Sequence, residues 1–420
     1  NAAFTVKVTV SKNKIEKIEY PDNLETIGVG KVALEKLSKK IIDRQSLGVD
    51  NVTGATITSF ALKGAVKKAL EQAKVSKADM AKLMKNSEKY TALPAEIKTN
   101  VVVVGGGGAG LSASIAAAQE GSKVILIEKS SFLGGDTMMA GGAFNAVDPE
   151  AQAERVLSEA QKNTLDSYLA LSTTDADLHL DQFPEWAEVL TTLQSDIQAF
   201  YKANAGKTAG KDMPGFDSIS LHMWHIYTGG LRQMNDGRWI ASDIDLARTL
   251  AESALNSYDW AGSIGVGTAS HAGAGDSLYT VLGAMWPRTH AYTAGLPLIQ
   301  VLQSAAEKEG VTIYTETAAK SLIADDNGRV TGVQAEKADG TAVTLEAGHG
   351  VVLASGGYCA NPAMVKQYDE YWGDDLTDRT LTTNVGTNTG DGIVMAMEIG
   401  ADTTGLGVSQ LMPSSSPIKG

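Results

Sequence analysis

The sequence has little of what would build metal, disulfide or membrane chemistry. Cys359 is the single cysteine among 420 residues, which excludes an intramolecular disulfide and any cysteine-rich metal or iron–sulfur site. His271 and His290 have no partner at a spacing typical of metal ligands, so no metal site is predicted. No uninterrupted apolar run reaches the ~18 residues that a transmembrane helix needs.

Positive charge is scarce except near the start of the chain. The formal net charge is −13, yet residues 1–75 carry 13 Lys+Arg against 8 Asp+Glu. The acidic remainder argues against nucleic acid as a partner, because phosphate contacts need a basic surface. The lysine-rich N-terminal part is interpreted as a solvated face, with docking onto an acidic electron donor as the alternative.

Residues 1–75 form the first predicted domain, a small α+β unit. Residues 4–10 alternate apolar and polar side chains, as a half-buried strand does. Residues 32–42 and 60–73 carry apolar side chains at helical spacing, and a Gly/Thr-rich loop lies between them. The polar, lysine-rich residues 76–97 follow as a linker.

A large α/β domain is predicted at residues 98–408, where the composition changes sharply. A run of four valines precedes a glycine cluster, a small-residue helix and the strand KVILIEK, which together make a βαβ unit. Residues 150–285 are predicted to be a mainly helical insertion. The later segments VTIYTE, SLIADD, VTGVQAEK, VTLEA and VVLASGG are predicted as strands.

The strongest motif is GGGGAG at residues 105–110, between a strand and a helix. Gly105 allows a tight turn, Gly107 lets the backbone approach a pyrophosphate, and Gly110 lets helix and strand pack closely. The helix N-terminus then presents N–H groups to phosphate. Glu128 ends the second strand, 18 residues after Gly110, and can accept hydrogen bonds from ribose hydroxyls. The pattern predicts a dinucleotide site.

Further glycines favour FAD over NAD as the dinucleotide. Residues 134–145, GGDTMMAGGAFN, hold two glycine pairs close to the first loop. The SGG turn that begins at Ser355 and the GDG at residues 390–392 add places where backbone can approach a ligand. Asp391 could hydrogen-bond a ribose or ribityl hydroxyl. A glycine turn explains each feature singly, whereas together they indicate an extended cofactor.

These residues resemble the fumarate reductase/succinate dehydrogenase flavoprotein family, most of all its soluble flavocytochrome c and urocanate reductases. The matching segments are GGGGAG, LIEK, GGDTMMAGGAFNA, WPRTHAYTAG, ASGG and TGDG. The resemblance implies a Rossmann-type domain with non-covalent FAD. The motifs and the resemblance together give the expected FAD-binding positions: Gly105, Gly107, Ala109, Gly110, Glu128, Lys129, Gly134, Gly135, Asp136, Thr137, Gly141, Gly142, Ala319, Ser355, Gly356 and Asp391. Asp136 stands where many relatives carry Asn or Ser.

A second flavin is implied by residues 50–56, DNVTGAT, which match the flavinylation motif DxxTGAT of FMN-binding domains. In that family a flavin transferase links the FMN phosphate to a threonine hydroxyl. The resemblance assigns this covalent FMN to Thr56, with Thr58 as the fallback. A following helix would offer its N-terminus to the phosphate. The alternative is that the threonine is only a helix N-cap.

The resemblance implies a flavin-dependent reductase that passes electrons from FMN to FAD and then, as hydride, to the C=C bond of an α,β-unsaturated carboxylic acid in anaerobic respiration. Its expected partners are that small acid, a flavin transferase and a soluble or membrane-associated electron donor. The two-flavin combination resembles extracytosolic bacterial reductases. We therefore expect an extracytoplasmic location, with a leader removed before Asn1.

No catalytic residue is assigned, because the resemblance places the proton-donating arginine of the family beyond Gly420. Residues 409–420 are interpreted as the start of a capping domain. Within them, SQLMP resembles the family's QxHP, whose histidine binds a fumarate carboxylate, and Met412 stands at that position. A thioether cannot bind a carboxylate as histidine does, which disfavours fumarate and favours an acrylate, cinnamate or urocanate-like acid. A shifted register is the alternative.

Other interpretations stay open. A flavin electron-transfer protein without substrate chemistry would explain the missing acid, and the reading frame beyond Gly420 distinguishes the two. A desaturating dehydrogenase of ketosteroid type shares the FAD fold, but covalent FMN counts against it. His222, Trp224 and His225 are interpreted as core residues, and Arg288 as a structural or flavin-contact residue.

Overall fold

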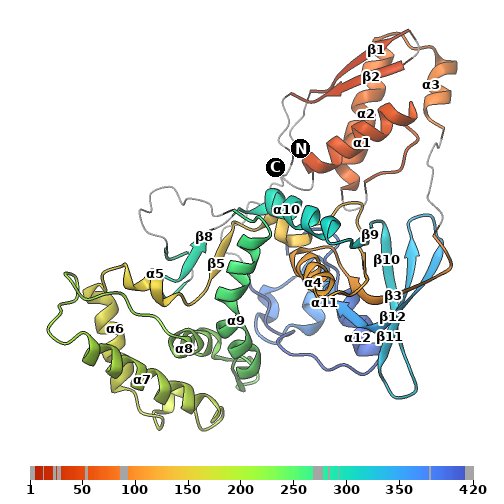
Figure 1. Ribbon diagram of the computed structural model, residues 1–420. Coiled ribbons are helices and arrows are strands. Elements are labelled where there is room, and N and C mark those ends of the chain that lie inside the picture. The colour runs from red at the N-terminus through yellow and green to blue at the C-terminus, as the bar shows by residue number, and fades with distance from the viewer. Residues whose placement is uncertain are drawn as a thin grey trace. The chain divides into compact units, whose positions relative to one another are not determined.

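The chain folds into two compact units. The computed structural model describes residues 5–12, 14–21, 25, 30–52, 55–85, 93–267, 278–281, 284–291, 293–377 and 380–411, with only the backbone of residues 56 and 57. Unit 1 comprises residues 1–140, 295–369 and 374–420, and unit 2 comprises residues 141–294 and 370–373. Unit 1 contains a small N-terminal α+β part and a large sheet, and unit 2 is mainly helical (Figure 1).

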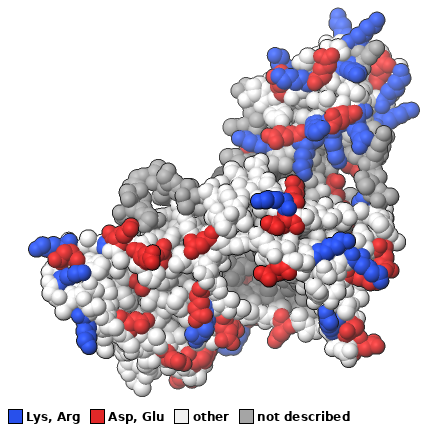
Figure 2. Space-filling view, viewed as in Figure 1, with Lys and Arg blue, Asp and Glu red and all other residues white. Residues whose placement is uncertain are grey.

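The N-terminal part of unit 1 is a β-hairpin packed on helices. Its elements are β1 (Lys7–Ser11), β2 (Lys14–Glu19), α1 (Gly30–Arg44), α2 (Thr56–Gln72) and α3 (Lys77–Leu83). The two strands pair antiparallel, with Val8 opposite Ile18. Both long helices turn an apolar stripe inward, at Leu34, Leu37 and Ile41 and at Leu62, Val66 and Leu70. Lysine and arginine side chains crowd the outer surface of this part (Figure 2).

Helix α2 starts earlier than the apolar spacing predicts. The N-cap residue is Ala55, which has no side-chain cap, and Thr56 is the first helical residue. The interpretation of Thr56 as an N-cap is therefore wrong. The buried Ser59 hydroxyl holds the loop instead, because it accepts from Val52 N at 3.0 Å and donates to Ala55 O at 2.9 Å. Residues 53–54 of the flavinylation motif lie outside the described residues.

The large sheet of unit 1 has the strand order β10-β11-β12-β3-β4-β9. Its strands are β3 (Glu96–Val104), β4 (Val124–Ile127), β9 (Thr312–Tyr314), β10 (Thr317–Ala324), β11 (Val330–Lys337) and β12 (Ala342–Leu353). Strands β12, β3, β4 and β9 are parallel, and β10 and β11 add an antiparallel extension. Val102, Ile125 and Leu126 are almost completely buried, as continuous apolar strands in a parallel sheet should be.

Helices cover this sheet. Helix α4 (Gly108–Gln119) connects β3 to β4 and packs against α10 (Gly295–Lys308), as Figure 1 shows. Helix α12 (Asp391–Glu398) packs against β10, and α11 (Pro362–Tyr368) lies between β12 and α12 in sequence. The predicted strand VTLEA and the start of VVLASGG belong to one strand, β12, because the chain stays extended through a register shift between Ala347 and Gly350. β12 ends at Leu353, so the ASGG part follows the strand. The Rossmann-type core of the α/β prediction is confirmed.

Unit 2 is a helical body with two short ribbons. Its elements are β5 (Ala143–Asn145), α5 (Pro149–Ala153), α6 (Glu159–Ala170), α7 (Trp186–Ala203), α8 (Ile219–Gly230), β6 (Arg232–Gln233), β7 (Trp239–Ile240), α9 (Ile244–Ser263) and β8 (Thr289–Ala291). Trp186, Trp224 and Tyr227 are fully buried at its centre. Ser158, Ser218 and Asp243 cap α6, α8 and α9 through their side chains. None of the described helices, in either unit, is long and apolar enough to cross a membrane.

A polar cluster lies within the core of unit 2. Arg288 donates two hydrogen bonds to Asp217, at 3.0 and 2.7 Å, and both side chains are almost fully buried. Burial raises the pKa of Asp217 to about 6, and the hydrogen-bonded guanidinium of Arg288 opposes this because it favours the charged carboxylate. His222 and His225 lie on α8, and Tyr168 hydroxyl contacts His225 Nε2 at 3.1 Å. Arg288 is thus a structural residue.

The two histidines are neutral in the folded protein. Burial lowers the pKa of both His222 and His225 to about 3, and the positive charge of Arg288 acts in the same direction. A buried imidazolium beside a guanidinium would lack both solvent and a counter-charge. As predicted, these histidines are core residues, and their neutrality is a condition of that packing.

We expect the free energy of unfolding to fall as the pH is lowered from about 6.5, the unfolded pKa of histidine, towards 3. Each histidine is neutral when folded and takes up a proton on unfolding, which costs up to about 1.4 kcal/mol of stability per pH unit. Denaturant titrations at a series of pH values will measure this slope. The double variant His222→Gln, His225→Gln should show a shallower slope; an unchanged slope would contradict the assignment. The contribution of Asp217 to the slope has the opposite sign, because its pKa is raised in the folded protein, but the wild type and the double variant share this contribution.

Candidate functional site

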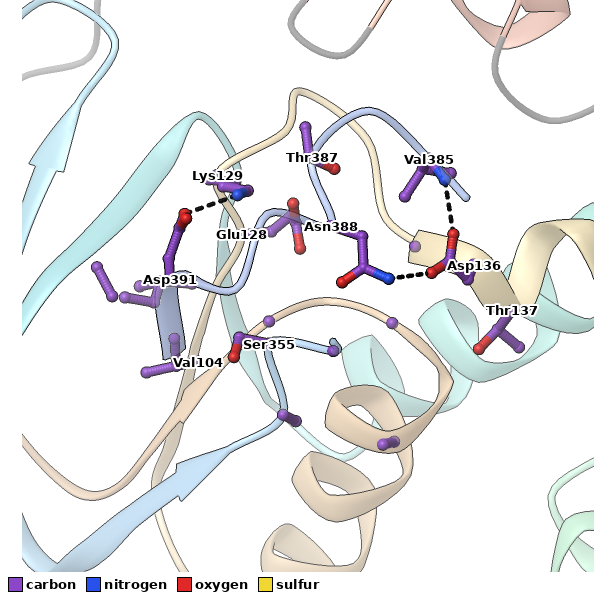
Figure 3. Close-up of a pocket in the computed structure, with 18 of the residues that line it drawn as sticks. Val104, Glu128, Lys129, Asp136, Thr137, Ser355, Val385, Thr387, Asn388 and Asp391 are labelled. Atoms are coloured by element: carbon purple, nitrogen blue, oxygen red, sulfur yellow. Dashed lines mark hydrogen bonds and ion pairs between the residues drawn. The ribbon is translucent and has the colours of Figure 1, made fainter. Parts of the chain in front are cut away.

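A pocket opens in unit 1 where β3, β4 and β12 end (Figure 3). Ligands of open α/β sheets bind at this carboxyl edge of the strands. Most of the lining comes from the glycine loop, the end of β4, the segment 135–137 and the loop before α12. The lining residues are Val104, Gly105, Gly107, Gly108, Ala109, Ile127, Glu128, Lys129, Gly135, Asp136, Thr137, Thr317, Ala319, Ala354, Ser355, Gly356, Val385, Thr387, Asn388, Asp391 and Met395.

The glycines of the first loop differ in backbone conformation and in the space around them. Gly105 has φ +107°, a left-handed backbone that favours glycine. A Cβ on Gly110 would lie 1.8 Å from Gly105 O, so only glycine lets helix α4 come this close to the turn. A Cβ on Gly107 would meet no atom closer than Gly134 O at 3.8 Å, so this position faces open space at the pocket.

The start of α4 suits a phosphate. The first-turn N–H groups of a helix have no intrahelical acceptor, and they carry the positive end of the helix dipole. Gly108 N uses the Thr137 hydroxyl as an acceptor at 3.2 Å. The loop is held from the other side by Gly134 N, which donates to Gly106 O at 2.8 Å. The backbone around Gly107 and Ala109 is left facing the pocket.

Two acidic side chains, Glu128 and Asp391, also line the pocket. Glu128 accepts from Gly106 N and Ser130 N, each at 2.7 Å, and a carboxylate retains further lone pairs for ribose hydroxyls. Asp391 accepts from Lys129 Nζ at 2.7 Å and from Thr389 Oγ1 at 2.7 Å. Burial alone would raise the pKa of Asp391, but these two donors hold it below its usual range. Lys129, which follows Glu128, thereby joins the end of β4 to the start of α12.

Asp136 joins two distant segments across the pocket. It lies in the short helix η1 (Gly135–Met139), and its carboxylate accepts from Val385 N at 2.6 Å and from Asn388 Nδ2 at 2.5 Å. Both donors point at the same carboxylate in Figure 3. An amide at position 136 could accept from only one of them with its oxygen. This geometry gives a physical reason for an aspartate at position 136.

Most of the residues expected to bind FAD are brought together here. Twelve line the pocket: Gly105, Gly107, Ala109, Glu128, Lys129, Gly135, Asp136, Thr137, Ala319, Ser355, Gly356 and Asp391. Gly110 and Gly134 do not line the pocket, but both are positions where a side chain would clash: a Cβ on Gly134 would lie 2.3 Å from Met138 Cγ. Gly141 and Gly142 belong to unit 2 and do not line this pocket. Met412 lies outside the described residues.

Sequence reasoning missed the loop before the GDG turn. Val385, Thr387 and Asn388 line the pocket, as do Thr317 and Met395. The nearest signal in the sequence is that Asn388 precedes Gly390 by two residues, which alone does not indicate a ligand contact. The arrangement fits FAD in three respects. The open position at Gly107 lies at the N-terminus of α4, and Glu128 follows the end of β4. The buried Asn388 Oδ1 has no partner among the described residues.

Two alanine variants separate folding from FAD binding. Gly110→Ala places a methyl group against Gly105 O, so we expect a lower unfolding temperature or loss of soluble protein. Gly107→Ala meets no protein atom, so the apoprotein should lose only about 1 kcal/mol or less from the weaker N-cap. Its FAD affinity should fall by at least ~10-fold, about 1.4 kcal/mol, because the methyl group occupies the approach to the pyrophosphate. Normal FAD affinity in Gly107→Ala would contradict this placement.

Comparison with known proteins identifies the family of each part of the chain. The model of the FAD binding domain family matches residues 100–419, and that of the FMN-binding domain matches residues 1–71. NADH:acrylate oxidoreductase of Vibrio harveyi is 33% identical over 422 residues, which cover 100% of this chain and 40% of that protein. Urocanate reductase of Eggerthella lenta is 26% identical over 418 residues, 98% of this chain and 56% of that protein.

Among solved structures, the open conformation of a flavocytochrome c3 fumarate reductase aligns with a TM-score of 0.47 at 25% identity, over 73% of this chain and 41% of that chain. The chain spans about half the length of the curated relatives that it matches. The family matches confirm the resemblance and the prediction of two flavins, FAD and FMN. Because one family model covers most of its length, the chain belongs to the FAD binding domain family of fumarate reductase-type flavoproteins, and it carries an FMN-binding domain at its start.

Proposed function

We propose that this chain is the two-flavin part of a reductase for the C=C bond of small α,β-unsaturated carboxylic acids. The observation that carries the proposal is the 33% identity to an NADH:acrylate oxidoreductase over the whole chain, which includes both flavin-binding domains. The 26% identity to a urocanate reductase over nearly the whole chain supports the same class of substrate.

The pocket residues would hold FAD. The backbone at Gly107 and Ala109 would bind the pyrophosphate, and Glu128 would accept from ribose hydroxyls. Asp136 and Thr137 would fix the loop that closes over the cofactor. Bound FAD supplies hydride transfer to an activated double bond, and FMN supplies the incoming electrons. The protein's task is to position the flavin and to exclude competing reactions.

The covalent FMN is assigned to Thr56. Thr58, the fallback position, is buried, and its hydroxyl donates to Glu25 Oε2 at 3.1 Å. Ser59 is fully buried and bonded on both sides by the loop. A flavin transferase needs an accessible hydroxyl, so both neighbours are poor acceptors. Helix α2 begins at Thr56, which would place a linked phosphate at the helix N-terminus.

An acrylate-like or urocanate-like acid is the proposed substrate. Met412 stands at the position of the family's carboxylate-binding histidine, which disfavours the dicarboxylate fumarate. We further propose an extracytoplasmic location and a role in anaerobic respiration, with electrons from a soluble or membrane-associated donor and with a flavin transferase as the modifying partner. These points rest on the resemblance of the two-domain chain to extracytosolic reductases.

Peptide mapping will locate the covalent flavin. When the protein is produced together with a flavin transferase, we expect one FMN on the peptide that contains Thr56. Thr56→Val should abolish the modification, and Thr58→Val should retain it, because the Thr58 hydroxyl is already committed to Glu25. Mass spectrometry of intact protein and of peptides measures both. FMN on Thr58, or none at all in the wild type, would refute the assignment.

An electron-acceptor screen will test the substrate class. The natural full-length protein, loaded with both flavins, should oxidise reduced viologen with acrylate, cinnamate or urocanate at least ~10-fold faster than with fumarate, because a thioether at position 412 gives no charged partner to a second carboxylate. Fast turnover of fumarate alone would overturn this inference. Turnover of none of the acids, with both flavins reducible, would instead favour the electron-transfer protein.

A further inference from the structure

Asn388 is a buried polar residue with one unused hydrogen-bonding atom. Its side chain lines the pocket and the residue is 7% exposed. The amide nitrogen has two acceptors, whereas Oδ1 has no hydrogen-bond partner among the described residues. A buried acceptor without a donor is costly, so native structures rarely keep one unless a ligand or water completes it.

The orientation of this amide is fixed by its neighbours. Asn388 Nδ2 donates to Asp136 Oδ2 at 2.5 Å and to Asn384 Oδ1 at 3.1 Å. Asn384 is itself oriented, because its Nδ2 donates to Thr382 Oγ1 at 3.2 Å. A flipped Asn388 amide would turn its oxygen towards two other oxygens. The nitrogen therefore faces Asp136, and the oxygen points away from it, as Figure 3 shows.

The space beside this oxygen is open because the neighbouring residue, Gly356, has no side chain. Gly356 has φ +77°, and a Cβ there would lie 3.2 Å from Asn388 Oδ1. The charged side chains that line the pocket already have partners: Glu128 binds backbone N–H groups, and Lys129 and Asp391 bind each other. Among the described lining residues, Asn388 Oδ1 is therefore the buried side-chain acceptor that still lacks a donor.

We propose that Asn388 Oδ1 accepts a hydrogen bond from a hydroxyl or N–H donor of bound FAD, and that Asp136 and Asn384 are positioning residues that aim this oxygen into the pocket. FAD offers such donors on its ribose, its ribityl chain and both ring systems. The acceptor-only carboxylate of Asp136 holds the amide nitrogen and Val385 N together. This inference needs only FAD binding and does not depend on which acid is reduced.

The test is the affinity of the apoprotein for FAD, measured by isothermal titration without any substrate. Protein made without flavin transferase avoids interference from covalent FMN. Asn388→Leu keeps the approximate side-chain volume and removes the acceptor, so the FAD dissociation constant should rise by at least ~10-fold. The matched control Asn327→Leu makes the same change at an exposed residue that does not line the pocket, and it should change the constant by no more than ~2-fold.

Three further measurements distinguish a lost contact with FAD from a damaged loop and locate the donor on FAD. The unfolding temperature of apoprotein Asn388→Leu shows whether a loss of FAD affinity reflects a damaged loop. If that variant does not fold, Asn388→Ser, whose hydroxyl can still donate to Asp136, should weaken FAD binding by at least ~3-fold. Titration with ADP assigns the donor: weaker ADP binding in the variant places it on the adenosine half, and unchanged ADP binding places it on the flavin half. If the folded Asn388 variants bind FAD with a dissociation constant within ~2-fold of the wild type, the proposal is wrong.

Discussion

The FAD-binding core depends on one close approach of two backbone segments. At Gly110 the first turn of α4 comes so near to Gly105 O that a Cβ would lie 1.8 Å from that oxygen. This contact sets the angle at which α4 leaves β3, and so the direction of its N-terminus. The N–H groups at the start of α4, which would face a bound phosphate, take their direction from this contact. The same turn brings Gly106 N against Glu128, which connects the phosphate end of the pocket to the end of β4.

Long-range side-chain contacts then close the pocket around that turn. Asp136 binds Val385 and Asn388, which lie 249 and 252 residues later in the chain. Lys129 binds Asp391 over a separation of 262 residues. These contacts join the segments that follow β4 to the loop before α12. The site is thus held together by one ion pair and by hydrogen bonds from amide groups, at the edge of a sheet, and this is the arrangement that a preorganised cofactor site needs.

Unit 2 buries polar side chains in its core, where they bond to one another. The pair Arg288–Asp217 is inaccessible to solvent and needs excellent geometry to offset its desolvation, which its two hydrogen bonds supply. His222 and His225 remain neutral next to it, so their rings pack as aromatic core residues. The charge of Arg288 is balanced inside the unit by Asp217.

The sequence by itself determined the βαβ core and the need for glycine at positions 105 and 110. It also determined the place of Glu128 after β4 and the presence of two flavin-binding domains. Those features depend on residues close together in the chain, where turn chemistry, strand composition and helix starts act locally. Only the tertiary structure decided that Asn388 enters the pocket, that Asp136 serves as an acceptor for two donors, and that α2 begins at Thr56 with Ala55 as its N-cap. These outcomes depend on contacts between segments far apart in sequence or on the packing of a whole helix, which no local pattern encodes.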